Sequence, residues 1–120
     1  QAGWQIKAEM VDKKAYDRLP AETKQNAMHA WLNPADLEWP LVVRQPVEGE
    51  RWSPLGMVHK HQKMSDFLIN KKIPRAARSF WPVVCSGGSI LWVAGLRIAQ
   101  AWRLTGDEGE VLHLQLIPPA

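Results

Sequence analysis

The sequence has a single cysteine and no long apolar run, which exclude an intrachain disulfide and a membrane-spanning segment respectively. Cys85 alone cannot form an intrachain disulfide, which fits a reducing, cytoplasmic compartment. No apolar run is long enough to span a bilayer, so we expect no membrane partner. Residues 1–9 lack the charged-then-apolar pattern of a signal peptide, and we interpret the chain as one part of a longer protein.

The sequence also lacks the usual signatures of catalysis. No nucleophile is paired with a base, and no set of residues has the spacing of a metal site. Ser86-Gly87-Gly88-Ser89 begins like a phosphate-binding loop, but that loop requires a following Asp and a helix whose N-terminus holds the phosphate. Residues 90–93 are strand-like instead, which favours a hairpin turn. We expect neither catalysis nor a bound cofactor in this chain.

Acidic residues are scarce in the middle of the chain. Residues 57–103 hold eight Lys or Arg against a single acid, Asp66, a net charge of +7. Residues 1–56 carry −1 and residues 104–120 carry −3, so the overall charge of +3 conceals a strongly basic central segment. Such a segment indicates a polyanionic partner, and we expect nucleic acid.

Tryptophan is abundant in this sequence, whereas tyrosine and phenylalanine are few. Seven tryptophans stand against one tyrosine and two phenylalanines, and an indole ring either fills a core or offers a stacking face. Trp92 lies in a strand-like apolar run and is expected in the core. Trp81, beside a basic segment, is the best candidate for an exposed aromatic residue, although the core is still the favoured place for it.

Most of the predicted elements are strands, and the short helices lie mid-chain. Alternating or β-branched runs predict strands at residues 4–10, 27–32, 41–44 and 111–117, and a hairpin at 82–93. Ser65 is expected to cap a helix that stops before Pro74, and a second short helix is expected from Pro74. Residues 34–38 fit one further helical turn. At 120 residues the expected fold class is one α+β, β-rich domain with two short central helices.

Three motifs occur in order along the chain. They are Arg44 with Gly49-Glu50-Arg51-Trp52 and Pro54-Leu55-Gly56-Met57; Lys63-Met64-Ser65-Asp66-Phe67 with Lys72-Ile73-Pro74-Arg75 and Arg78; and Trp92-Val93-Ala94-Gly95-Leu96-Arg97. In this order and spacing they resemble the C-terminal domain of tRNA(Ile)-lysidine synthase, a bacterial ATP-dependent ligase. The resemblance covers roughly residues 27–117. Glu50, Trp52 and Met64 stand where the family usually has Asp, Phe and Leu, and each keeps the chemical character.

The resemblance implies both a fold and a role. The fold is a small β-rich sandwich with helices, related to a domain of the phenylalanyl-tRNA synthetase β subunit. Residues 1–120 would be a single domain, the tRNA-binding C-terminal domain of a longer ligase whose N-terminal catalytic domain holds ATP and Mg and attaches lysine to the wobble cytidine of the anticodon. The domain would bind the acceptor stem of tRNA-Ile so that the anticodon reaches the distant active site. The implied partners are tRNA and the catalytic domain.

The resemblance and the scarcity of acids together assign the central cations to phosphate contact. The candidate RNA-binding residues are Lys60, Lys63, Lys71, Lys72, Arg75, Arg78, Arg97 and Arg51. For Arg97, a structural ion pair with Asp66 or Glu50 is an equal alternative. His59 and His61 are expected in a solvated or phosphate-facing loop rather than at a metal.

Two other functions stay open on the sequence alone. A self-contained interaction module would dock its basic segment on an acidic protein surface, or on the catalytic domain, and have no RNA role. A small free-standing enzyme has little support without a nucleophile, a metal set or a phosphate loop. The sequence does not determine the oligomeric state, and a homodimer is compatible with it.

Overall fold

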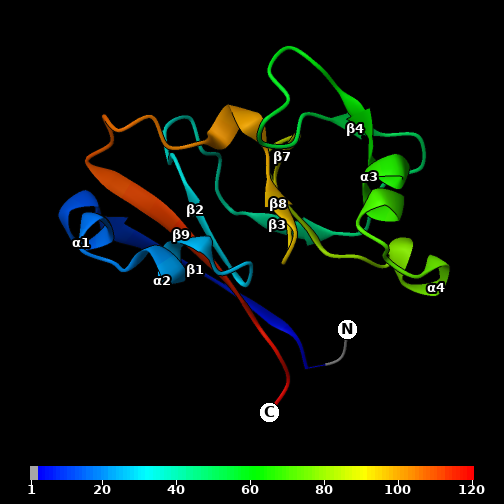
Figure 1. Ribbon diagram of the computed structural model, residues 1–120, viewed down its shortest axis with the longest axis horizontal. Coiled ribbons are helices and arrows are strands. Elements are labelled where there is room, and N and C mark those ends of the chain that lie inside the picture. Colours follow the sequence, from blue (N-terminus) through cyan, green and yellow to red (C-terminus); the bar gives the residue numbers. More distant parts are fainter. Residues whose placement is uncertain (1–2) are drawn as a thin grey trace.

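Three small antiparallel sheets and four short α-helices build the computed structural model, which describes residues 3–120 (Figure 1). The terminal sheet has the strand order β1 (Gln5–Asp12), β9 (Glu110–Ile117) and β2 (His29–Leu32). The central sheet has the order β3 (Val42–Arg44), β6 (Val83–Ser86), β7 (Ser89–Val93) and β8 (Arg97–Ile98). A two-stranded ribbon pairs β4 (Arg51–Trp52) with β5 (Gln62–Lys63).

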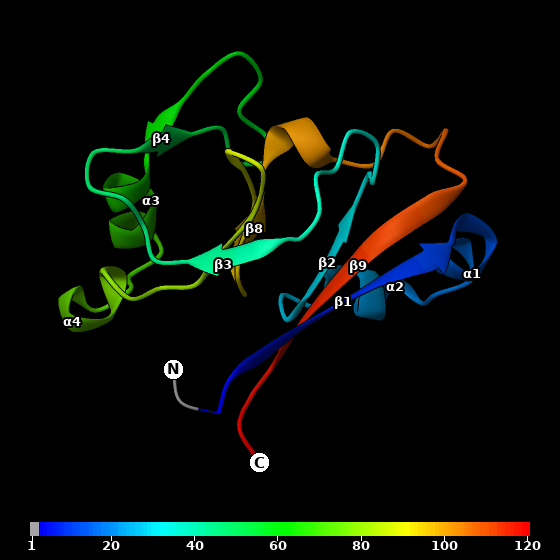
Figure 2. The same ribbon diagram turned by 180° about the vertical axis from the view of Figure 1, so that it is seen from behind.

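The helices lie at the two ends of the molecule. α1 (Lys13–Asp17) and α2 (Ala21–Gln25) follow β1 beside the terminal sheet, and α3 (Met64–Asn70) and α4 (Arg75–Arg78) lie at the opposite end (Figures 1 and 2). A 3-10 turn, Gln100–Trp102, precedes the return to β9. Among the helices of residues 3–120, none combines the length and the apolarity that crossing a bilayer requires.

The first core fills the space between the terminal and central sheets. Side chains alternate along β9, so Leu112, Leu114 and Leu116 face inward. They form one cluster with Leu91 and Trp92 of β7, and Trp92 is 1% exposed, as expected for a core residue. Burying each such side chain contributes about 1.5–3 kcal/mol, which holds the last strand of the chain against its middle.

A second core covers the opposite face of the central sheet. Val83 of β6 belongs to one cluster with Phe67 and Leu68 of α3 and Trp52 of β4. The rings of Trp52 and Phe67 meet edge to face with 5.0 Å between their centroids. Met64, Phe67 and Leu68 have the i, i+3, i+4 spacing of one helix face, which explains why this short helix is held against the sheet.

The predicted hairpin and fold class are both confirmed. β6 and β7 pair around the two-residue turn Gly87-Gly88. Leu91 has no partner in β6 and forms a β-bulge, so that it and the following Trp92 both join the first core. Two sheets packed face to face, with helices at either end, make the expected α+β, β-rich sandwich with two short central helices.

Two local predictions are wrong. α3 begins at Met64, and its N-cap residue is Lys63 rather than Ser65, because β5 runs directly into the helix. Residues 34–38 form a turn and not a helical turn. The reason is Asp36, whose φ of 64° is a left-handed conformation that cannot continue a right-handed helix.

Candidate nucleic-acid interface

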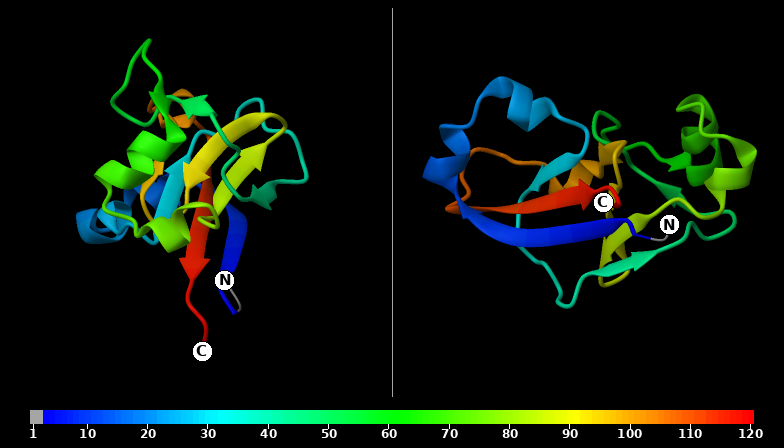
Figure 3. Two further views of the ribbon diagram at one scale, coloured as in Figure 1. Left: turned by 90° about the vertical axis from the view of Figure 1, so that its right-hand side faces the viewer. Right: turned by 90° about the horizontal axis from the view of Figure 1, so that it is seen from below.

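The fold separates the charges of the chain in space. Residues 41–103 form the central sheet, the ribbon, α3 and α4, and hold ten Lys or Arg against three Asp or Glu, a net charge of +7. The rest of the chain, residues 1–40 and 104–120, forms the terminal sheet, α1 and α2. It holds five Lys or Arg against nine Asp or Glu, a net charge of −4. The two parts lie side by side (Figure 3). A polyanion is therefore attracted to one part and repelled by the other.

All eight predicted RNA-binding residues belong to the positive part. We call them the basic surface: Arg51, Lys60, Lys63, Lys71, Lys72, Arg75, Arg78 and Arg97. Across residues 3–120, no carboxylate forms an ion pair with any of these side chains. A cation without a counterion from its own chain keeps its charge available to the phosphates of a ligand.

Lys72 owes its position to the cap that ends α3. The Ile73 N–H donates to the Leu68 carbonyl at 3.1 Å, and the Lys72 N–H donates to the Ile69 carbonyl at 2.8 Å. These two bonds form a Schellman motif, which requires a left-handed residue, usually glycine. Here that residue is Lys72, with a φ of 61°. The cap fixes the backbone of an exposed lysine between α3 and α4.

Arg75 and Arg78 lie on one face of α4, as the sequence predicts. Both line one hollow of about 640 Å³, together with residues 46–49 and the first residues of α3. Arg75 is exposed and Arg78 is half-buried. Glu48 also lines the hollow and opposes an anion there. The planar guanidinium group offers paired N–H donors that suit phosphate oxygens, so these two arginines can contact one RNA backbone.

Lys71 and Arg97 meet at the ring of Phe67. The Lys71 Nζ lies 5.8 Å from the ring centroid, and the Arg97 guanidinium carbon lies 5.9 Å from it. Such contacts orient a cation without neutralising it. The alternative of an ion pair between Arg97 and Asp66 or Glu50 is wrong, since the described chain contains no such pair.

The ribbon carries the remaining members of the basic surface. Arg51 of β4 lies opposite Lys63 of β5, and like charges across a strand pair disfavour folding. The Arg51 guanidinium donates to the His61 carbonyl at 3.4 Å, and Lys60 is exposed in the connecting loop. His59 is exposed in the same loop. Nowhere in residues 3–120 are three His, Cys, Asp or Glu side chains grouped to hold a metal ion.

Sequence reasoning missed the ion pair of Arg44 with Glu50. Arg44 Nη2 donates to Glu50 Oε1 at 2.8 Å, Arg44 Nη1 donates to Oε2 at 3.1 Å, and the Val47 N–H donates to Oε2 at 2.7 Å. The hydrogen bond to Glu50 raises the pKa of Arg44. Burial alone would raise the pKa of Glu50, but the bonds from Arg44 and Val47 outweigh it and lower that pKa. The pair closes the loop that forms one wall of the hollow.

A second cluster that sequence reasoning missed lies on the terminal sheet. His29 Nδ1 and His113 Nε2 share a hydrogen bond of 2.8 Å, and His113 Nδ1 lies 3.2 Å from Glu9 Oε1. The Trp31 ring stacks on His113 with 4.0 Å between centroids. Burial, and then the neighbouring His113, lower the pKa of His29. The alternation of β2 and β9 is the one signal in the sequence that places these rings on the same face.

The single cysteine and Trp81 are placed largely as expected. Cys85 is buried in β6, and burial raises the pKa of its thiol, which disfavours the reactive thiolate. Trp81 is half-buried, and its Nε1 donates to the Ala94 carbonyl at 2.9 Å. Its indole is therefore neither a fully buried core residue nor a free surface ring.

Comparison with known proteins connects this geometry to a family. A family model described as the TilS substrate C-terminal domain matches residues 41–116. The tRNA(Ile)-lysidine synthase of Dehalococcoides mccartyi is 28% identical over 113 residues, 94% of this chain and 23% of that protein. The enzyme of the same name from Symbiobacterium thermophilum is 34% identical over 94 residues, 78% of this chain and 18% of that protein. The enzyme from Clostridium acetobutylicum is 32% identical over 76 residues, which is 63% of this chain and 16% of that protein. The chain thus spans 16–23% of the length of these relatives.

Comparison with solved structures leads to the same family. A crystal structure of a TilS C-terminal domain superposes with a TM-score of 0.77 at 26% identity, covering 97% of this chain and 85% of that chain. The N-terminal fragment of the phenylalanyl-tRNA synthetase β subunit from Pyrococcus horikoshii superposes with a TM-score of 0.71 at 13% identity, covering 93% of this chain and 39% of that chain. At so low an identity, this similarity shows a shared fold alone. Because the family model covers more than half of the chain and a solved domain shares its fold throughout, the chain belongs to the family of tRNA(Ile)-lysidine synthase C-terminal domains.

Proposed function

We propose that this domain binds tRNA through the basic surface. The observation that carries the proposal is the gathering of eight cationic side chains, none paired with a carboxylate of the described chain, on the part of the molecule with a net charge of +7. Unpaired cations within one part of a small domain repel one another and so destabilise the fold. A bound RNA backbone supplies the missing negative charge.

Within a whole ligase the domain would hold its substrate. The relatives carry the name tRNA(Ile)-lysidine synthase, and this chain matches only a minor share of each. The domain binds the acceptor stem of tRNA-Ile, and a separate catalytic domain, with ATP and Mg, attaches lysine to the wobble cytidine. That catalytic domain is the second partner, and the cytoplasm is where such a ligase meets its tRNA.

Contacts to phosphates recognise the shape of a double-stranded stem rather than its base sequence. Lysine ammonium groups and the two arginines of α4 contact phosphates, whose arrangement reports the shape of an A-form helix. The deep, narrow major groove of that helix is closed to side chains. We therefore expect the domain to prefer structured RNA and to tolerate exchanges of base pairs within the stem.

Neutralising two cations at a time tests the proposal. Arg75→Gln combined with Arg78→Gln removes both arginines of the hollow, and binding of a tRNA acceptor-stem hairpin should weaken by about tenfold or more. The matched control is Lys14→Gln combined with Arg18→Gln, which removes the same charge from exposed side chains at α1. The control should change binding only slightly.

Two results would reject tRNA binding by the basic surface. One is equal weakening in both double variants, since net charge alone would then govern affinity. The other is unchanged hairpin binding in the Arg75 and Arg78 variant, combined with lost binding to the separately purified catalytic domain. That second result would favour an interdomain docking module. Thermal unfolding of each variant confirms that it is folded.

A further inference from the structure

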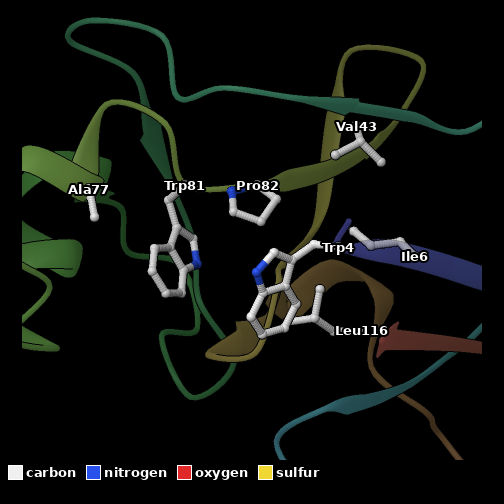
Figure 4. A pocket seen from close by; sticks show the side chains of 7 residues that line it. All are labelled: Trp4, Ile6, Val43, Ala77, Trp81, Pro82 and Leu116. Atoms are coloured by element: carbon white, nitrogen blue, oxygen red, sulfur yellow. The ribbon is translucent and has the colours of Figure 1, made fainter. Parts of the chain in front are cut away.

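A cavity of about 450 Å³ lies beside α4, on a different face of that helix from Arg75 and Arg78 (Figure 4). Trp4 and Trp81 lie on opposite sides of it, and the other lining residues are Ile6, Val43, Ala77, Pro82 and Leu116. Among the described residues, none that lines the cavity carries a charge. Its volume and its two indole side chains suit a small, flat aromatic ring.

The two indole rings differ in how firmly they are held. Trp81 is fixed, because its Nε1 donates to the Ala94 carbonyl at 2.9 Å and its ring is half-buried. Trp4 is 44% exposed, and within the described residues its side chain has neither a hydrogen bond nor a ring contact. The space between the rings is open rather than closed by stacking of one indole on the other. A flat ligand can therefore enter against a rigid wall while Trp4 adjusts.

α4 connects this cavity to the basic surface. Ala77 lines the cavity, while its neighbours Arg75 and Arg78 line the hollow in which we place the RNA backbone. The helix has four residues and is roughly 6 Å long, so the aromatic cavity lies within a short reach of both guanidinium groups. A ligand that carries a flat aromatic ring and a phosphate on the same unit satisfies both faces of α4.

We propose that the cavity binds an unpaired nucleobase of the same RNA, in a single-stranded segment that adjoins the stem. The proposal rests on the proposed function, since Arg75 and Arg78 are then the phosphate contacts of the adjoining backbone. Bases inside a duplex are stacked and out of reach, whereas unpaired bases stack on aromatic side chains. Stacking on the indoles tolerates any base, and a purine gains the larger contact.

Charge complementarity favours a nucleotide over a peptide side chain as the occupant. An apolar peptide segment would fill the cavity but leave Arg75 and Arg78 without partners, as they are in the described chain. An acidic peptide would meet the arginines but not the uncharged cavity. A nucleotide supplies a ring and a phosphate together.

The test compares two RNA hairpins that share one stem, one blunt and one with a short single-stranded 3′ extension. The unmodified chain should bind the extended hairpin about fivefold or more tightly than the blunt one. Trp4→Ala should remove most of that gain and leave affinity for the blunt hairpin unchanged. The matched control is Trp39→Ala, which removes an indole that is 58% exposed and does not line the cavity, and it should keep the gain.

A second variant tests the cavity independently, in case the Trp4→Ala chain does not fold. Ala77→Leu fills the cavity from α4 without removing a ring, and it should also abolish the gain while blunt-hairpin binding persists. A gain that survives both variants would overturn the cavity proposal, because added phosphates alone would explain it. Equal binding of the two hairpins by the unmodified chain would also overturn it and leave tRNA binding intact. Failure to bind either hairpin would overturn the proposed function as well.

Discussion

At the scale of single residues, Lys72 has a backbone conformation that is costly for any residue except glycine. The cap of α3 needs a left-handed residue, and a non-glycine residue in that conformation costs about 1–2 kcal/mol. Glycine would avoid that cost, although it loses more conformational freedom on folding. A lysine at this position is therefore unfavourable for the fold, and it places a positive charge between α3 and α4.

Replacing Lys72 with Gly separates these two roles. We expect the free energy of unfolding to stay the same or to rise by up to about 1 kcal/mol. Affinity for a tRNA stem should fall, and the slope of log affinity against log salt should shrink by about 0.7–0.9. The matched control is Lys71→Gly, at a φ of −82° where glycine brings no relief, and it should lower stability. A destabilised Lys72→Gly chain with unchanged binding would refute this account.

Glu50 is expected to matter for stability rather than for binding chemistry. Glu50→Gln leaves the half-buried Arg44 without its counterion, which should cost about 1–3 kcal/mol of unfolding free energy. Because the folded-state pKa of Glu50 is lowered, the stabilisation is complete above its ordinary pKa of 4.5 and is lost as the pH falls through the folded value. Chemical denaturation at pH 7 and pH 3 should show a large difference between the proteins at pH 7 and a smaller one at pH 3. A difference independent of pH would contradict the ion pair's role.

Single-residue roles were the least predictable part of the site. The charge excess of residues 57–103 and the i, i+3 spacing of Arg75 and Arg78 are visible in the sequence, and in the structure both arginines line one hollow. The partner of Glu50 was not visible, because Arg44 reaches it across a loop whose closure depends on the fold. The contact of Arg97 with Phe67 likewise depends on packing between β8 and α3.

At the scale of elements, α4 is the helix on which the binding account depends most. It has four residues and no buried side chain, so it contributes little to the core. It presents Arg75 and Arg78 to one hollow and Ala77 to another. We therefore propose that α4 positions side chains for a ligand more than it stabilises the domain.

Arg78→Ala should weaken tRNA binding and leave the melting temperature nearly unchanged. The reason is that no described carboxylate pairs with Arg78, so its loss leaves no buried charge behind. Electrophoretic mobility shift and thermal unfolding measure the two quantities on the same preparation. Arg18→Ala, at the exposed end of α1, is the control and should alter neither. Unchanged binding with a large fall in melting temperature would make Arg78 a structural residue.

Elements with a strong local signal were predictable, and elements set by long-range packing were not. The two-glycine hairpin and the alternating strand β9 follow from local sequence alone. The bulge at Leu91 and the start of α3 at Met64 do not, because each is fixed by which core the neighbouring side chains enter. Asp36 ended the expected helical turn through a left-handed φ that its sequence context did not indicate.

At the scale of the whole molecule, the chain should not perform the ligase reaction by itself. Ser86 to Ser89, which begins like a phosphate-binding loop, forms the hairpin between β6 and β7 and has no helix after it. Purified chain incubated with ATP, lysine and tRNA should give neither ATP turnover nor lysidine. Either product, after removal of contaminating enzymes, would show that a catalytic site exists within these residues.

The charge distribution spans the whole molecule, and we propose that the positive part, which lies beside a negative one, binds the backbone of tRNA. The most direct test is the affinity for tRNA measured over a range of salt concentrations. If between four and eight members of the basic surface contact phosphates, log affinity should fall with log salt with a slope of about −3 to −7. Base-pair exchanges in the stem should leave that slope unchanged. A slope near zero would contradict phosphate contact and the account built on it.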